Sequence, residues 1–282
     1  MQLGDADQDR SNVEDRRGFA GTGIKLGLGG TVVLIVLSLI FKTDLFSAAQ
    51  QAPSTATDQV APAQDPESTE RGASERGLER VAVGSFNDVQ RVWAQLLTGS
   101  RYRDAKLVLF WDQVRSGCGA AAAEMGPFYC PLDERVYIDL GFYRDLSGRF
   151  GAPGDFAQAY VIAHEVGHHV QNLLGISERA QAAQQRNPGG RNAVSVRMEL
   201  QADCLAGVWG HSAAQRNLLD PGDVEEGLRA AAAVGDDHIQ KMAGRRVSPE
   251  SFTHGSAAER SRAFRRGLES GSLRACDAYA LE

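Results

Sequence analysis

The segment Ala163–His169, with the sequence Ala-His-Glu-Val-Gly-His-His, carries residue types that bind and use a metal ion. An α-helix advances about 100° per residue, so His164 and His168 lie one turn apart and can share one ion. Glu165 projects toward the open side of such a site, where a carboxylate can accept a proton from water. His169 lies about 140° around the helix from His164 and is not an expected ligand. The pattern predicts a zinc site with its own general base; a helix with surface histidines is the alternative.

A second motif, Glu-Leu-Gln-Ala-Asp beginning at Glu199, supplies the third protein ligand that a catalytic zinc site needs. A longer motif with a third histidine is excluded, because Leu174 stands where that histidine would be. On a helix predicted over Ser195–Trp209, Glu199 and Asp203 face the same way at i and i+4. We expect Glu199 to be the third ligand and Asp203 to accept the free ring N–H of a ligating histidine. The alternative for both acids is a solvated helix face.

These motifs resemble those of the bacterial membrane-anchored neutral zinc metallopeptidase family. The residues that carry the resemblance are Asn12–Gly18, Tyr160–Gln171, Glu199–Gly207 and Thr253–Ser256. The Glu-x-x-Ala-Asp pattern is also similar to membrane-linked gluzincin peptidases, which supports Glu199 as a ligand. The resemblance covers both ends of the chain except the segment around Ala48–Glu79, and it implies peptidase activity without naming a substrate.

The fold class predicted from the pattern is α+β, a mostly helical zincin-like domain with a small sheet. The 282 residues are 43% hydrophobic, which fits one globular domain with appendages and excludes a protein that crosses the membrane many times. The net charge of −6 argues against nucleic acid as a partner. Oligomeric state is not predicted.

An apolar segment near the N-terminus predicts one transmembrane helix over 23–46. Lys25 and Lys42 lie near the two ends of this helix, where their side chains can reach the membrane surface. Basic residues precede this segment more often than they follow it, so residues 1–22 are expected in the cytoplasm and the domain outside it. One alternative is a cleaved signal peptide, because Ser47–Ala49 is similar to a cleavage site. The other is a buried hairpin helix of a soluble domain. The expected location is the cell membrane, with a single crossing.

Four cysteines fit an oxidising compartment and allow three pairings. Cys118 and Cys130 bracket a short loop rich in Ala and Gly, so we expect them to pair locally. That leaves Cys204, on the Glu199 helix, to bind Cys276. The alternative, four free thiols, would fit a cytoplasmic protein.

Residues 47–80 are rich in small and polar residues and predict a flexible linker, followed by the metallopeptidase domain over 81–282. A helix is expected to open at Phe86–Asp88, and the metal helix to span Phe156–Leu174 and stop at Gly175. Further helices are expected to start at Asp220–Pro221 and at a capping box over Ser256–Glu259.

Strands are predicted over Leu107–Phe110 and Val136–Asp139, with Phe128–Tyr129 as a third. An extended substrate can add to the edge of a sheet as another strand. By analogy with zincins, Val136–Asp139 is the expected edge.

His254 precedes the capping box in a Thr-His-Gly-Ser turn. Its functional interpretation is a second electrophile that hydrogen-bonds the oxyanion formed during peptide hydrolysis. The alternative is a histidine that bonds to the loop that holds it. His211 and His238 lie on helical stretches and are expected to be surface or packing residues.

The expected function is a zinc-dependent peptidase, more specifically an endopeptidase, with one Zn²⁺ per chain and a peptide or protein as substrate. His164, His168 and Glu199 would hold the metal, and Glu165 would move the proton. The alternative is a membrane-tethered binding or scaffold protein with a structural metal. A structural zinc site has four protein ligands, and these motifs supply three.

Overall fold

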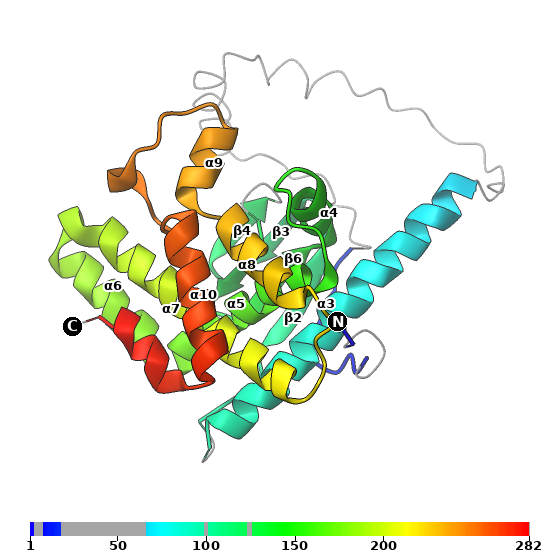
Figure 1. Cartoon of the computed structure of the whole chain (residues 1–282), viewed down its shortest axis with the longest axis horizontal. Coiled ribbons are helices and arrows are strands. Elements are labelled where there is room, and N and C mark those ends of the chain that lie inside the picture. The colour runs from blue at the N-terminus through cyan, green and yellow to red at the C-terminus, as the bar shows by residue number, and fades with distance from the viewer. Residues whose placement is uncertain (3–7, 18–65, 99–100, 123–125, 282) are drawn as a thin grey trace. The chain divides into compact units, whose positions relative to one another are not determined.

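The computed structural model describes residues 1–2, 8–17, 66–98, 101–122 and 126–281 (Figure 1). They form the α+β structure that was predicted, mostly helical with a small sheet. Residues 1–17 and 72–282 belong to one compact unit, and 18–71 to a second unit of which only 66–71 are described. The apolar segment at 23–46 lies outside the described residues. Within the described part of the chain, no helix combines the length and hydropathy needed to cross a bilayer.

Among the described residues the main sheet has four strands, in the order β1 (Val13–Asp15), β2 (Lys106–Phe110), β6 (Arg135–Asp139) and β5 (Phe128–Cys130). The first three strands are parallel, and β5 is antiparallel to β6. The prediction that Val136–Asp139 forms an edge is wrong, because β2 and β5 pair with it on both sides. The edge strand that contacts the metal helix is β5.

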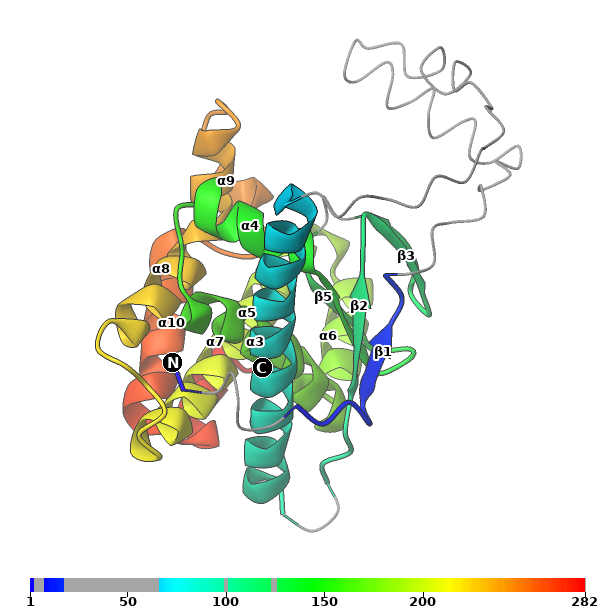
Figure 2. The ribbon, with the colours of Figure 1, turned by 90° about the vertical axis from the view of Figure 1, so that its right-hand side faces the viewer.

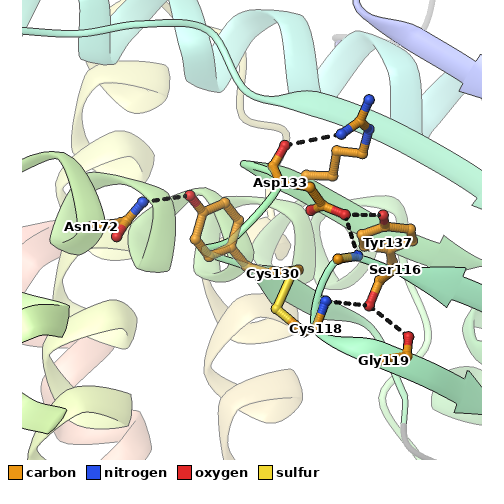
Figure 3. Close-up of a disulfide and its surroundings, with 10 residues drawn as sticks. Ser116, Cys118, Gly119, Cys130, Asp133, Tyr137 and Asn172 are labelled. Atoms are coloured by element: carbon orange, nitrogen blue, oxygen red, sulfur yellow. Dashed lines mark hydrogen bonds between the residues drawn. A yellow bond between two sulfur atoms is a disulfide. The ribbon is translucent and has the colours of Figure 1, made fainter.

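A separate hairpin, β3 (Gln113–Ser116) and β4 (Gly119–Ala122), forms a second sheet. The disulfide between Cys118 and Cys130 joins its turn to β5 (Figure 3). The other disulfide joins Cys204 to Cys276, so both expected pairings are confirmed. In the described residues neither disulfide contributes a metal ligand.

Helices form most of the rest of the described chain. The longer ones are α3 (Pro66–Leu96), α4 (Leu140–Gly148), α5 (Asp155–Leu173), α6 (Ile176–Arg186), α7 (Arg191–Gln215), α8 (Asp223–Ala233), α9 (Asp236–Met242) and α10 (Ala257–Ser270). The part of the chain that the structure describes also has three 3-10 helices, η2 (Pro188–Gly190), η3 (Pro249–Ser251) and η4 (Leu273–Tyr279). Helices α5, α7, α8 and α10 pack against one another, and this bundle carries the candidate site (Figure 1).

Local sequence signals predict the ends of some helices correctly and of others incorrectly. The metal helix α5 ends just before Gly175, which adopts a φ of 67°, and the capping box of Ser256 and Glu259 opens α10. Both predictions are confirmed. The expected start at Asp220–Pro221 is wrong, because α8 begins at Asp223. The Asp223 carboxylate instead accepts a hydrogen bond from the backbone N–H of Asp220 at 2.8 Å.

Helix α3 begins at Pro66, so two predictions need correction. Residues 66–80 of the predicted linker are helical, and the helix does not begin at Phe86. Composition alone suggested disorder, but tertiary contacts hold this part of the helix. Leu78 packs against the main core, and Glu79 forms ion pairs with Arg10 and Arg17. The part of the linker before residue 66 lies outside the described residues.

The N-terminal segment was predicted to be separate from the domain, and for residues 13–15 this is wrong. Strand β1 runs beside β2, with Val13 opposite Leu107 and Asp15 opposite Leu109 (Figure 2). A strand of three residues has too weak a periodic pattern to be recognised from sequence. Strand β1 is therefore recognised only by its pairing with β2 in the tertiary structure.

Candidate metal centre

Three side chains from two helices converge as the motifs predicted. His164 and His168 lie on α5, and Glu199 lies on α7. The Nε2 atom of His164 is 3.2 Å from one carboxylate oxygen of Glu199, and Nε2 of His168 is 3.4 Å from the other. One potential ligand atom from each residue lies within 4.8 Å of the other two.

This geometry fits a tetrahedral zinc ion. Zinc bonds to histidine nitrogen and carboxylate oxygen are about 2.0–2.1 Å long, so the edge of the ligand tetrahedron is about 3.3 Å. The two distances between His164 or His168 and Glu199 match that edge. Two imidazoles and a carboxylate are also a donor set of catalytic zinc sites.

A glycine lets the two metal helices approach. Gly167 stands between the two histidines on α5, and a Cβ atom there would lie 3.0 Å from the backbone oxygen of Ala202 on α7. A side chain at this position would push the helices apart. The close approach brings Glu199 to His164 and His168.

His164 is held by two charged residues and a tyrosine, Asp203, Arg260 and Tyr160, which we call the charged side of the centre. One carboxylate oxygen of Asp203 accepts a hydrogen bond from Nδ1 of His164 at 2.8 Å, and the Tyr160 hydroxyl donates to the same oxygen at 2.5 Å. The guanidinium of Arg260 donates to both oxygens, at 2.8 and 3.0 Å. Because Nδ1 of His164 is engaged, its Nε2 is left to face Glu199.

His168 is held by uncharged groups, namely Gln171, Gln201 and the backbone carbonyl of Met198. We call these groups the neutral side of the centre. The Gln171 side-chain oxygen lies 2.8 Å from Nδ1 of His168. The Gln171 amide nitrogen donates to the Met198 carbonyl at 2.8 Å and to the Gln201 side chain at 3.0 Å. Nε2 of His168 is thereby also left facing Glu199.

The electrostatics of the site favour a cation. Burial raises the pKa of Glu199, but His168 and His164 outweigh it and hold the pKa well below its usual range. Burial likewise opposes ionisation of Asp203, and Arg260 and His164 keep its pKa low. Burial disfavours charge on His164 too, yet Asp203 and Glu199 raise its pKa to about 10. A proton and a metal ion therefore compete for the same nitrogen.

Glu165, the predicted general base, lies beside His164 and is 7% exposed. It lines the same cavity as the three ligands, with a volume of about 1000 Å³. Aromatic side chains from the sheet side and aliphatic ones from the α8–α9 side also line this cavity; they include Trp111, Phe128, Tyr129, Phe142, Phe150, Val234, Ile239 and Met242. The cavity therefore presents a carboxylate and a cation site within partly apolar walls.

His254 lines this cavity too, so the structure brings it near the predicted ligands. Its Nδ1 lies 3.1 Å from one carboxylate oxygen of Asp236, and the other oxygen accepts the backbone N–H groups of Thr253, His254 and Gly255. The hydrogen bond to Asp236 raises the pKa of His254 above its ordinary value. Nδ1 of His254 also lies 3.1 Å from the Thr253 hydroxyl of its own turn, so this side chain both bonds to its loop and lines the cavity.

The other histidines are not in the metal cluster. His169 contacts the Tyr129 hydroxyl and the backbone carbonyl of Arg103, and His211 contacts the backbone carbonyl of Leu268. His238 is half-buried on α9 and is not in the candidate metal groups among the described residues.

A second acidic group, Asp155, Asp223 and Glu226, also has oxygens close enough to hold an ion. However, the Met1 amino group lies 2.9 Å from Asp155 and 3.4 Å from Asp223. This ammonium group pairs with two of the three carboxylates, so the group is described as an ion-pair cluster.

Sequence analysis did not identify Arg260, Tyr160, Gln171 or Asp236. Spacing offered a signal for two of them, because Tyr160 precedes His164 by four residues and Gln171 follows His168 by three. Arg260 and Asp236 come from other helices, at sequence distances of 57 from Asp203 and 18 from His254. No local pattern links these pairs.

Comparison with known proteins shows the family to which the chain belongs. Residues 4–279 match the family described as "Putative neutral zinc metallopeptidase", and the chain belongs to this family. Zinc is the metal expected for its members.

Two relatives cover most of the chain. The uncharacterized protein YpfJ of Escherichia coli is 42% identical over 288 aligned positions, 96% of either chain. The uncharacterized protein Rv2575 of Mycobacterium tuberculosis is 41% identical over 255 positions, 86% of this chain and 85% of the relative. No solved structure matches this chain.

Proposed function

We propose that this protein is a zinc-dependent peptidase with a zincin-like site. The observation that carries the proposal is the convergence of His164, His168 and Glu199 at tetrahedral spacing on the wall of a cavity that Glu165 also lines. Among the described residues the metal group has three members, which leaves the open fourth position of a catalytic site.

A zinc ion held by these three residues would polarise a water molecule and the scissile carbonyl of a bound peptide. Glu165 would take the proton that the attacking water loses, and would return it to the departing amine as the C–N bond breaks. Protonated His254, held by Asp236, would donate a hydrogen bond to the oxygen that gains negative charge. These two side chains are the catalytic residues of the proposal.

The substrate is proposed to be an extended peptide lying along β5. This strand is the sheet edge that contacts α5, and Phe128 and Tyr129 from it line the cavity. An edge strand offers unpaired backbone groups to a substrate backbone, which favours peptides over small molecules.

A location outside the cytoplasm is also proposed, with the membrane as a partner through the apolar segment at 23–46. The two disulfides support this location, because such bonds persist in oxidising compartments.

The test compares wild type with Glu165→Gln, measuring bound zinc by metal analysis and hydrolysis of a peptide library by mass spectrometry. We expect about one zinc per chain in both proteins by the three-ligand argument. Hydrolysis should fall at least about a hundredfold in the variant, because general-base assistance is typically worth 10²–10⁴-fold. Glu178→Gln, an exposed change on α6, is the matched control.

Zinc-loaded wild type that cleaves nothing in the library would favour the scaffold protein with a structural metal. A wild type that binds no transition metal would overturn the proposal altogether. Loss of zinc from Glu165→Gln would show that this carboxylate holds the metal instead of moving the proton.

A further inference from the structure

Helix α9 presents apolar side chains to the cavity of the metal centre instead of to the core. Ile239 is 39% exposed and Met242 is 40% exposed, and both line that cavity. The two residues stand at i and i+3 of the helix, so they lie on the same face. No residue of α9 is buried in the core. Ile239 and Met242, which we call the α9 face, are therefore available to contact a molecule in the cavity.

Three aromatic side chains, which we call the aromatic wall, line the same cavity from other elements. They are Trp111, which follows β2, Phe142 on α4, and Phe150, which follows α4. All three are partly exposed, and the ring centres of Phe142 and Phe150 lie 6.2 Å apart. Both overall views show α4 and α9 at the same end of the domain (Figures 1 and 2). The cavity thus receives apolar surface from separate segments of the chain.

Two arginines hold rings of the aromatic wall. The guanidinium carbon of Arg144 lies 5.5 Å from the centre of the Trp111 ring, and that of Arg149 lies 5.7 Å from the centre of the Phe150 ring. A cation over the face of an aromatic ring is attracted to it, which restrains the ring. Restrained rings lose little conformational freedom when a ligand binds. The aromatic wall is therefore prepared for contact.

The charges that line the cavity beyond the metal centre have both signs. Arg144 and Arg149 are basic, whereas Asp112 and Asp145 are acidic, and all four are exposed. Water and salt screen exposed charges, so this mixed set gives a ligand little preference for one sign. Apolar area removed from water instead favours binding in proportion to its size. Apolar contact is thus the property of this cavity that can discriminate between ligands.

We propose that the α9 face and the aromatic wall select peptides with a large apolar side chain, such as phenylalanine, leucine or methionine, near the bond to be cleaved. The inference deepens the proposed peptidase function and rests on it for the cleavage. A peptide is the occupant because edge strand β5 lines the same cavity through Phe128 and Tyr129, and its backbone can pair with a peptide backbone. A lipid acyl chain would use the apolar surfaces but not the strand.

The test uses Glu165→Gln, which is expected to hold a substrate without cleaving it. The immobilised variant is incubated with a random peptide library, and mass spectrometry identifies the retained peptides, which should be enriched in large apolar residues. Calorimetry then compares one retained peptide with a version in which serine replaces the apolar residue. Affinity should fall at least about tenfold, because a single methylene group in an apolar pocket is typically worth about 10–200-fold.

Ile239→Ser together with Met242→Ser removes the α9 face in the Glu165→Gln protein. Both side chains are exposed, so folding and zinc content should not change. Affinity for the apolar peptide should fall at least about tenfold, whereas Ile239→Leu together with Met242→Leu should keep it. Leu96→Ser is the matched control, because Leu96 is 45% exposed on α3 and lies outside this cavity. Its affinity should equal that of Glu165→Gln alone.

Retained peptides without apolar enrichment, or an unchanged affinity in the double serine variant, would overturn the inference. Wild type that cleaves the library without preference for large apolar residues would also overturn it, while the peptidase proposal stands. Apolar enrichment on Glu165→Gln beside a wild type that cleaves nothing would refute the peptidase proposal and support the cavity as a peptide-binding site. Palmitate binding that depends on the α9 face, with no peptide retained, would assign the cavity to an acyl chain and overturn the inference.

Discussion

His164 and His168 stand one turn apart on α5, yet the protein holds them in different ways. Asp203, itself fixed by Arg260 and Tyr160, binds the ring of His164, whereas the neutral amide of Gln171 binds the ring of His168. An ionised acceptor makes a stronger hydrogen bond than a neutral one. The charged side is therefore expected to contribute more to zinc affinity than the neutral side.

The difference also shows how a buried carboxylate is accommodated. Asp203 is fully buried, and an unpaired charge there would be costly. Arg260, which is 4% exposed, supplies the opposite charge from α10. The helices α7 and α10 approach closely because Gly207 and Gly267 have no side chains, and a Cβ at either would meet the backbone at about 2 Å.

The largest effect is expected from the ligand that both sides share. Glu199 faces both histidines, so Glu199→Gln replaces an anionic ligand with a poor neutral donor. Zinc affinity should fall by more than the roughly 100-fold that is typical when a residue hydrogen-bonded to a metal ligand is lost. Metal analysis after dialysis against a weak chelator measures it, with Glu178→Gln as control. Full occupancy in Glu199→Gln would mean that another residue is the third ligand.

On the charged side, Asp203→Asn keeps the shape of the side chain and removes its charge. Zinc affinity should fall about 10–100-fold, as is typical when a partner of a metal-bound histidine is lost. Competition with a chromogenic chelator gives the dissociation constant. An unchanged constant would contradict the role given to Asp203.

Arg260→Gln tests whether Arg260 positions Asp203, and the chain offers a matched control. Arg216 binds the buried Asp88 at 2.6 and 2.8 Å, away from the metal ligands. Both Arg260→Gln and Arg216→Gln should lower the free energy of unfolding in denaturant. Zinc affinity should fall about tenfold in the first and stay unchanged in the second. If both variants bound zinc with equal affinity, Arg260 would stabilise the fold without positioning Asp203 for the metal.

On the neutral side, Gln171→Leu removes the hydrogen bond to His168 while keeping a side chain of similar size. The expected loss of zinc affinity is smaller than for Asp203→Asn, at the low end of about 10–100-fold. The same chelator competition measures both variants. A larger loss for Gln171→Leu would reverse the comparison between the two sides.

The smallest effect is expected at the ion pair between His254, whose side chain is half exposed, and Asp236. The hydrogen bond to Asp236 and the charge of Glu199 raise the pKa of His254, while burial and Arg260 lower it. Because the folded pKa is raised, its stabilising contribution is complete below about pH 6.5 and is lost as the pH rises through the folded value.

His254→Gln should therefore destabilise the protein at pH 5.5 more than at pH 8.5, as measured by denaturant unfolding with chelator present. The reverse pH dependence would show that Asp236 does not raise the pKa of His254.

The amino-acid sequence by itself determined the features that depend on local spacing. The position of His164, Glu165 and His168 on one helix follows from the helical repeat, and the capping box of Ser256 opens α10 as its four residues predict. Glu199 and Asp203 were expected together because i and i+4 residues share a face, and both reach the centre. The disulfide pairing also followed, since Cys118 and Cys130 lie 12 residues apart across one loop.

Only the tertiary structure decided which distant segments meet. Arg260 reaches Asp203, and β1 joins β2, through contacts that no periodic pattern encodes. The tertiary structure also decided that β6 lies inside the sheet, because the sequence of a strand does not show how many strands pair with it. Local spacing fixes the direction of a side chain on its own helix, whereas strand order and long-range ion pairs depend on how whole elements pack.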